Sequence, residues 1–134
     1  TNAFRSNAPI YTLVKQITTI DTLFNPNSPK VVLDAHQQAL YFSRHAIPYM
    51  RGLPQEDWLS HHRYFKHIGL YAYRSDILPK LNQLPGSDLE RAESLEQLRW
   101  LQHGFQIQTV ETQFETIGID SPEDLEKIKK LGFI

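Results

Sequence analysis

Short apolar runs recur along the chain, and five of them predict β-strands. Residues 10–17 are rich in β-branched and aromatic side chains, which is typical of a largely buried strand. Residues 31–34 and 39–43 flank a polar segment with the length of a hairpin loop, so they predict an antiparallel pair. Residues 67–73 and 105–112 alternate in side-chain direction, as strands with two different faces do.

Two later segments carry helix signals. Ser87 and Glu90 match the S-x-x-E capping box, in which a hydroxyl and a carboxylate satisfy unpaired N–H groups at a helix start. Apolar residues then recur at every third position as far as Gly104, which predicts one amphipathic helix of about four turns: Leu89, Ala92, Leu95, Leu98 and Leu101. Ser121 and the Pro-Glu-Asp that follows it are typical of the start of a last helix, which ends at Gly132. The polar stretch 55–66 fits a loop or a short helix equally well.

Composition and charge narrow the class of protein. A chain of 134 residues with 40% apolar and 22% charged positions is typical of one globular domain. The formal net charge is −1 and no run of five or more basic residues occurs, so we expect no nucleic-acid partner. The apolar runs are far shorter than the roughly 20 residues that cross a bilayer, so we expect no membrane partner. There is no cysteine, which fits a cytoplasmic protein, and the first residues have neither a signal peptide nor an initiator Met, as in a processed chain or a fragment.

Four segments, in this order and spacing, resemble the C-terminal half of CMP-Kdo synthetases: FNPNSPKVVLDAHQQALYFSRHAIP, HIGLYAYR, LERAESLEQLRWL and IGIDSPEDLEKI. Together they cover nearly the whole chain. The resemblance implies an α/β fold, namely the C-terminal half of a Rossmann-like nucleotidyltransferase with a mostly parallel sheet and a dimerisation hairpin region. Residues 1–134 would then be a single partial domain, since no segment matches the nucleotide-phosphate loop or the metal motif of the family's N-terminal half.

The resemblance also implies a reaction. The anomeric hydroxyl of 3-deoxy-manno-octulosonate (Kdo) attacks the α-phosphorus of CTP, which forms CMP-Kdo and releases pyrophosphate. Both substrates are negatively charged, so such a site needs Mg²⁺ and well-placed donors. The resemblance implies a cytoplasmic homodimer that serves lipopolysaccharide assembly, and we expect the isolated chain to be inactive.

Five residues match positions that the family uses to bind the sugar acid. Arg44 follows the predicted strand 39–43, and a guanidinium suits a carboxylate. His67 and Tyr71 match groups that hydrogen-bond sugar hydroxyls, and their common strand face makes this pairing physically possible. Glu96 and Gln97 match a pair that contacts the same hydroxyls. Without the family context, each of these side chains is more often a solvated or structural residue.

Asp120 precedes Ser121 and matches the family's aspartate that helps to hold magnesium and is therefore catalytic. The alternative role of Asp120 is structural: its charge would stabilise the start of the last helix. Tyr73 shares the face of His67 and Tyr71, but we assign it to the core. A transition-metal site at His61, His62 and His67 is disfavoured, because adjacent histidines point in different directions.

Two other functions remain open at this point. One is a cytidylyltransferase for another acidic sugar, such as sialic acid, and the other is a dimeric binding module without catalytic activity. HIGLYAYR and LERAESLEQLR both match the Kdo branch, which favours Kdo.

Overall fold

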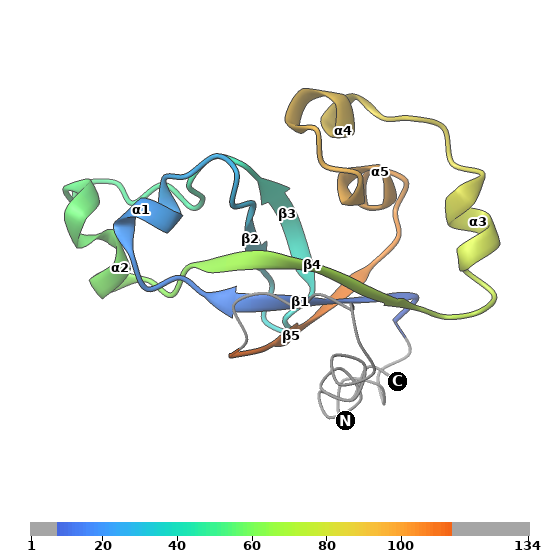
Figure 1. The fold of residues 1–134 in the computed structure, drawn as a ribbon, viewed down its shortest axis with the longest axis horizontal. Helices are drawn as coiled ribbons and strands as arrows, with labels where there is room; N and C mark the ends of the chain where they lie inside the picture. The colour runs from blue at the N-terminus through green and yellow to red at the C-terminus, as the bar shows by residue number, and fades with distance from the viewer. Residues whose placement is uncertain (1–7, 114–134) are drawn as a thin grey trace, which may run out of the picture.

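The computed structural model describes residues 8–113, which form a five-stranded sheet in the order β3-β2-β4-β1-β5 (Figure 1). The strands are β1 (Ile10–Gln16), β2 (Lys30–Leu33), β3 (Ala39–Ser43), β4 (Phe65–Tyr73) and β5 (Ile107–Glu111). Among the described residues, β1 and β5 pair in parallel, and the other three neighbouring pairs are antiparallel. This part of the sheet is therefore mixed rather than mostly parallel, because β2 and β3 form a hairpin and β4 runs against both of its neighbours.

β1 lies between β4 and β5, and both of its faces are covered. Ile10 and Val14 belong to the main core, whereas Tyr11 and Leu13 belong to a second cluster on the other face. A strand with two covered faces needs apolar residues at nearly every position, which explains the continuous run in the sequence. The prediction of a largely buried strand is confirmed.

The predicted antiparallel pair 31–34 and 39–43 is the hairpin of β2 and β3. Asp34 shapes its turn by accepting hydrogen bonds from the main-chain N–H groups of His36 and Gln38, at 2.8 and 2.9 Å. The carbonyl oxygen of Gln37 accepts from the hydroxyl of Thr109 on β5 at 2.6 Å. The sheet therefore curves enough for its hairpin to return to the opposite edge.

β4 keeps the two faces that alternation predicted, although its pairing with β1 is interrupted. Thr12 lies opposite Tyr71 and Leu13 lies opposite Ile68, so two residues of β4 between them form a bulge. Tyr71 and Tyr73 pack into the main core, and residues 68, 70 and 72 pack into the second cluster. A bulge of two residues preserves the alternation, because side chains repeat with period two.

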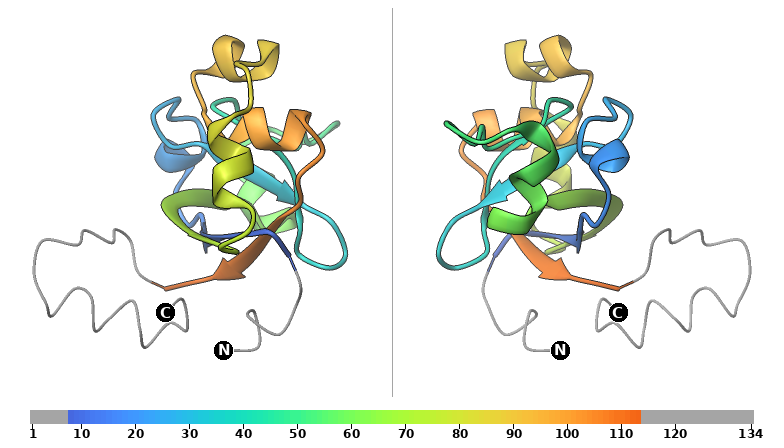
Figure 2. Two further views of the ribbon diagram at one scale, coloured as in Figure 1. Left: turned by 90° about the vertical axis from the view of Figure 1, so that its right-hand side faces the viewer. Right: turned by 90° about the vertical axis from the view of Figure 1, so that its left-hand side faces the viewer.

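The prediction of a single four-turn helix after Ser87 is wrong. The capping box of Ser87 and Glu90 is present, but the segment forms two helices, α4 (Asp88–Glu93) and α5 (Gln97–Gln102). Ser94 ends α4 in the left-handed conformation, with φ 54° and ψ 48°. The break separates the apolar positions, so Leu98 is buried while Leu89 is exposed. Both views of Figure 2 place α4 and α5 on the same side of the sheet.

The remaining helices are short. They are α1 (Ile20–Leu23), the 3₁₀ turn η2 (Gln55–Asp57), α2 (Trp58–His61) and α3 (Leu78–Asn82). The undecided stretch 55–66 thus contains helical turns, and they enclose the buried Trp58. The predicted last helix and Asp120 lie outside the described residues.

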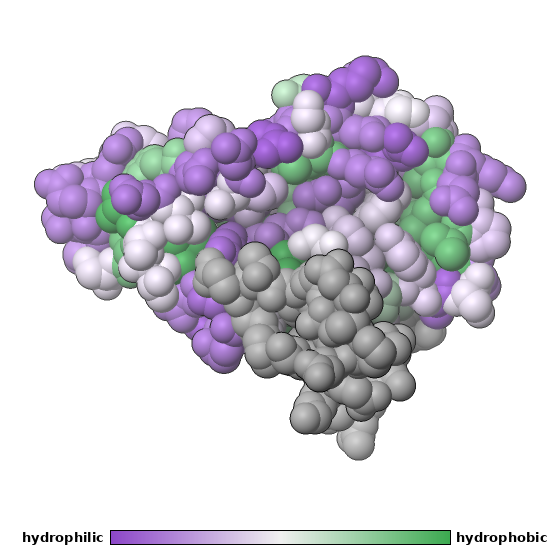
Figure 3. Space-filling view, viewed as in Figure 1, coloured by the Kyte–Doolittle hydropathy of each residue, from purple (hydrophilic) through white to green (hydrophobic). Residues whose placement is uncertain are grey.

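Polar side chains dominate the face seen in Figure 3, including the surface over α4. Between residues 8 and 113, no helix is long and apolar enough to cross a membrane.

Candidate functional site

His67 is the third residue of β4 and joins three structural elements. Its Nε2 lies 2.9 Å from the hydroxyl oxygen of Thr12 on β1. That hydroxyl donates its single hydrogen toward the carbonyl oxygens of β4, at 2.8 Å to Leu70, so it must accept from His67. Nε2 therefore carries the proton, and Nδ1 is an acceptor that faces the amide nitrogen of Gln97 at 3.4 Å.

Burial keeps this imidazole neutral. Loss of hydration lowers the pKa of His67 from 6.5 to about 4, because the charged form would lose its water without gaining a counter-ion. The ring packs edge-on against Phe42, with 4.9 Å between the ring centres. At neutral pH, His67 therefore offers a lone pair at Nδ1 rather than a positive charge.

Tyr71 stands two alternations further along the same face. Its ring centre lies 5.4 Å from that of His67 and 5.0 Å from that of Trp100 on α5. Burial, and then the nearby Tyr73 and Glu96, raise the pKa of Tyr71 well above its ordinary value. Its hydroxyl therefore stays protonated and can donate a hydrogen bond.

α5 brings the two polar residues of its start to this face. Glu96 is the residue before the helix, and Gln97 is its first residue. Gln97 is buried and reaches His67, whereas the exposed Glu96 is close enough to raise the pKa of both Tyr71 and Tyr73. Leu98 and Trp100 anchor the helix in the core and so hold these groups in place.

Arg44 joins this group through the turn between α4 and α5. Its guanidinium donates to three main-chain carbonyl oxygens, those of Pro26, Glu93 and Ser94, at 3.0, 2.6 and 3.0 Å. A guanidinium has five N–H groups, so two have no acceptor among the described residues and are available to a bound carboxylate.

The structure thus brings His67, Tyr71, Glu96 and Gln97 together and ties Arg44 to the adjoining turn. They come from the residue after β3, from β4 and from the start of α5, which lie far apart in the sequence. A neutral imidazole acceptor, a phenol donor, an amide and a carboxylate are suited to a molecule with several hydroxyls. Two neighbours were missed by sequence reasoning, Thr12 and Glu93. A polar residue within the apolar run 10–17 was the available signal for Thr12, whereas Glu93 resembles an ordinary helix-surface residue.

No group of three or more potential metal ligands converges within residues 8–113. His61 and His62 are exposed at the end of α2, and the ring of His62 packs edge-on against Tyr64. A shared site with His67 is not seen. Asp120, the predicted magnesium ligand, lies outside the described residues.

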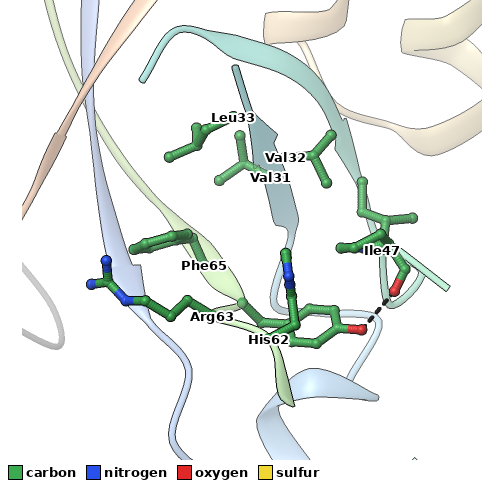
Figure 4. A pocket seen from close by; sticks show the side chains of 9 residues that line it. Val31, Val32, Leu33, Ile47, His62, Arg63 and Phe65 are labelled. Atoms are coloured by element: carbon green, nitrogen blue, oxygen red, sulfur yellow. Dashed lines mark hydrogen bonds between the residues drawn. The ribbon is translucent and has the colours of Figure 1, made fainter. Parts of the chain in front are cut away.

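A separate hollow of about 380 Å³ opens between β2, the start of β4 and the loop after β3 (Figure 4). Apolar side chains dominate its lining: Val31, Val32, Leu33, Ile47, Pro48, Tyr64 and Phe65, with His62 and Arg63. The hydroxyl of Tyr64 donates to the carbonyl oxygen of Pro48 at 2.6 Å. None of the predicted site residues lines this hollow, so it is distinct from the polar group around His67.

We expect His67 to make the folded state sensitive to acid. Its pKa is about 4 in the fold and about 6.5 in the unfolded chain, so the unfolded chain binds more protons between these values. The stabilising contribution is complete above pH 6.5 and is lost as the pH falls toward 4, by roughly 3 kcal/mol at most. Urea unfolding of the chain and of His67→Gln across this range measures it. Identical pH dependence of the two proteins would show that the imidazole is not shielded from water.

The sequence of this chain is similar to those of known proteins. A sequence model of the family described as Cytidylyltransferase matches residues 2–109. A 3-deoxy-manno-octulosonate cytidylyltransferase of Parabacteroides distasonis is 56% identical over 126 residues, which are 91% of this chain and 50% of that protein. One of Cytophaga hutchinsonii is 57% identical over 118 residues, 87% of this chain and 47% of that protein. The chain spans about half the length of these relatives.

The fold also matches a solved structure, that of CMP:2-keto-3-deoxy-manno-octonic acid synthetase complexed with CTP. The TM-score is 0.73 at 43% identity, over 94% of this chain and 49% of that one. This match confirms the predicted α/β nucleotidyltransferase fold, whereas the dimerisation hairpin stays a prediction. Because the family model covers well over half of the residues, this chain belongs to the cytidylyltransferase family.

Proposed function

We propose that this chain is the sugar-acid-binding and dimer-forming half of a 3-deoxy-manno-octulosonate cytidylyltransferase, which converts CTP and Kdo to CMP-Kdo and pyrophosphate. The observation that carries the proposal is the convergence of His67, Tyr71 and Gln97 on one face of β4, beside Glu96. The names of the relatives support the choice of Kdo. The proposal includes a cytoplasmic enzyme that serves lipopolysaccharide assembly, as the resemblance to CMP-Kdo synthetases implies.

Each residue has a role that follows from its chemistry. A sugar hydroxyl donates to Nδ1 of His67 in place of the long 3.4 Å contact with Gln97, and the hydroxyl of Tyr71 donates to another sugar oxygen. Glu96 and Gln97 hold further hydroxyls, and the two remaining N–H groups of Arg44 bind the sugar carboxylate. This binding fixes the anomeric hydroxyl for attack on the α-phosphorus of CTP, with pyrophosphate as the leaving group. Mg²⁺, held in part by Asp120, would neutralise the charge on the phosphate oxygens.

The test uses the full-length enzyme, because the isolated chain is expected to be inactive. Pyrophosphate release is measured from CTP with Kdo and, in parallel, with sialic acid. Turnover with Kdo and not with sialic acid supports the proposal, and the reverse result assigns the chain to the other acidic sugar. No turnover with either sugar, from a folded protein that binds CTP, would contradict the proposed reaction.

Replacement of Gln97 by alanine in the full-length enzyme should weaken sugar binding selectively. The amide contacts His67 and lies on the sugar side of the proposed site, so we expect the KM for Kdo to rise roughly tenfold, by about 1.4 kcal/mol, while the KM for CTP stays nearly constant. Steady-state kinetics with each substrate varied in turn measures both constants. Gln83→Ala, an exposed glutamine at the end of α3, is the matched control. Equal increases in both KM values would argue against a sugar-binding role for Gln97.

The isolated chain is expected to form a homodimer. β3 and the loop after it expose two large apolar side chains, Leu40 at 60% and Tyr49 at 74%, and such residues are stabilised when a second copy covers them. Light scattering should give twice the 15.6 kDa of one chain. A monomeric mass at tens of micromolar protein would contradict this expectation.

A further inference from the structure

The last residue of α4 is fastened to the end of β3 by hydrogen bonds in both directions. The side chain of Glu93 accepts from the main-chain N–H of Arg44 at 2.9 Å and from the hydroxyl of Tyr41 at 3.1 Å. The guanidinium of Arg44 donates back to the main-chain oxygens of Glu93 and Ser94. Both the side chain and the main chain at this position are therefore held by β3 and by the residue that follows it.

The carboxylate of Glu93 also balances nearby positive charge. Lys30 on β2 is fully buried, and burial together with Arg44 lowers its pKa to about 8, while Glu93 acts in the opposite direction. Burial alone would raise the pKa of Glu93, but hydrogen bonds from Arg44, Ser43 and Tyr41 outweigh it and hold the pKa below its ordinary value. Glu93 is thus an ionised group that offsets two neighbouring cations.

The break between α4 and α5 lies directly beside this attachment. Ser94 adopts a left-handed conformation that residues with a side chain seldom occupy, and its carbonyl oxygen accepts from Arg44. Glu96 and Gln97 follow immediately, and the direction of Gln97 toward His67 is set by this break. In a continuous helix each residue turns by about 100°, so an unbroken α4–α5 segment would point Gln97 elsewhere.

We propose that Glu93 is a positioning residue for the sugar-acid site, which aims the amide of Gln97 at His67 and holds Arg44 by fastening the α4–α5 turn to the end of β3. The inference rests on the proposed function. The carboxylate of Glu93 already accepts from the main-chain N–H of Arg44 and from the hydroxyls of Tyr41 and Ser43, so we assign it to holding the turn rather than to binding the sugar.

The experiment compares Glu93→Ala with Asp88→Ala in the full-length enzyme. Asp88 is an acidic residue of the same helix whose ion pair is with Arg91, one turn away on the surface. We expect Glu93→Ala to raise the KM for Kdo about tenfold or more, since small displacements of binding groups weaken binding strongly. The KM for CTP should change little, and Asp88→Ala should leave both values near normal. An unchanged KM for Kdo in Glu93→Ala would overturn the inference.

A second measurement separates positioning from plain stability. The KM for Kdo of Glu93→Ala is measured well below the Tm of this variant, where nearly all of it is folded, and it should stay raised there. A KM that returns to the normal value once the variant is fully folded would mean that Glu93 acts on stability alone, which contradicts the proposal. If Glu93→Ala does not fold, Glu93→Gln keeps one acceptor for the N–H of Arg44 and takes its place, with the same two outcomes.

The ring signals of His67 in NMR spectra test the positioning without any substrate. They should shift in Glu93→Ala and stay in place in Asp88→Ala, because only the first variant moves Gln97 away from Nδ1. Unshifted signals would overturn the inference. If the unmodified enzyme does not use Kdo, the proposed function fails, while these signals still report whether Glu93 positions Gln97.

Discussion

Replacement of Asp120 by asparagine in the full-length enzyme is expected to lower turnover by about a hundredfold or more, which corresponds to roughly 2.7 kcal/mol of transition-state stabilisation. Asparagine keeps the shape of the side chain but removes the charge that a hard cation such as Mg²⁺ requires. A metal-binding carboxylate acts most strongly where phosphate charge builds up in the transition state. The loss should therefore fall on kcat rather than on folding.

Thermal unfolding separates this role from a purely structural one. A charge before a helix start stabilises it by at most about 1 kcal/mol, so the Tm of Asp120→Asn should change little. Asp124→Asn is the matched control, since it removes an equal charge at the start of the same predicted helix. Near-normal turnover at saturating magnesium together with a clearly lowered Tm would show that Asp120 is structural and that the metal assignment is wrong.

Of the substitutions proposed here, Leu98→Ala is expected to destabilise the fold most. Leu98 has no exposed surface and anchors α5 against the sheet, so its truncation should leave a cavity and cost about 2–5 kcal/mol. Urea unfolding at one fixed protein concentration is the appropriate measurement, because the proposed dimer would make the stability depend on concentration. The start of α5 carries Gln97, so a weakened anchor should also loosen the sugar site.

Leu89→Ala provides the control within the same apolar pattern. Leu89 is 37% exposed on α4, so its truncation should cost no more than about 1 kcal/mol. The two changes alter helix propensity equally, so their difference measures burial. Equal losses would mean that both leucines face the core, as one continuous helix would require, and would contradict the break at Ser94.

The pattern of residues by itself determined the elements that depend on neighbours in the chain. Four features were predicted: the strand at 10–17, which the structure forms over Ile10–Gln16, the hairpin of β2 and β3, the capping box at Ser87 and the two faces of β4. Each depends on local geometry or on the two-residue repeat of side chains along a strand. The resemblance to a known family supplied the candidate site residues, which are Arg44, His67, Tyr71, Glu96 and Gln97. Their residue types alone did not distinguish them from ordinary surface or structural residues.

Tertiary structure alone decided how those residues meet. Glu93 and Arg44 are 49 positions apart, and no local pattern encodes their hydrogen bonds, which hold the turn at Ser94 where an apolar stripe predicted a continuous helix. Which ring nitrogen of His67 carries the proton likewise depends on Thr12, 55 positions away, whose hydroxyl already donates to β4. Contacts of this kind arise only after the sheet and helices have packed, because packing sets which buried polar groups find partners.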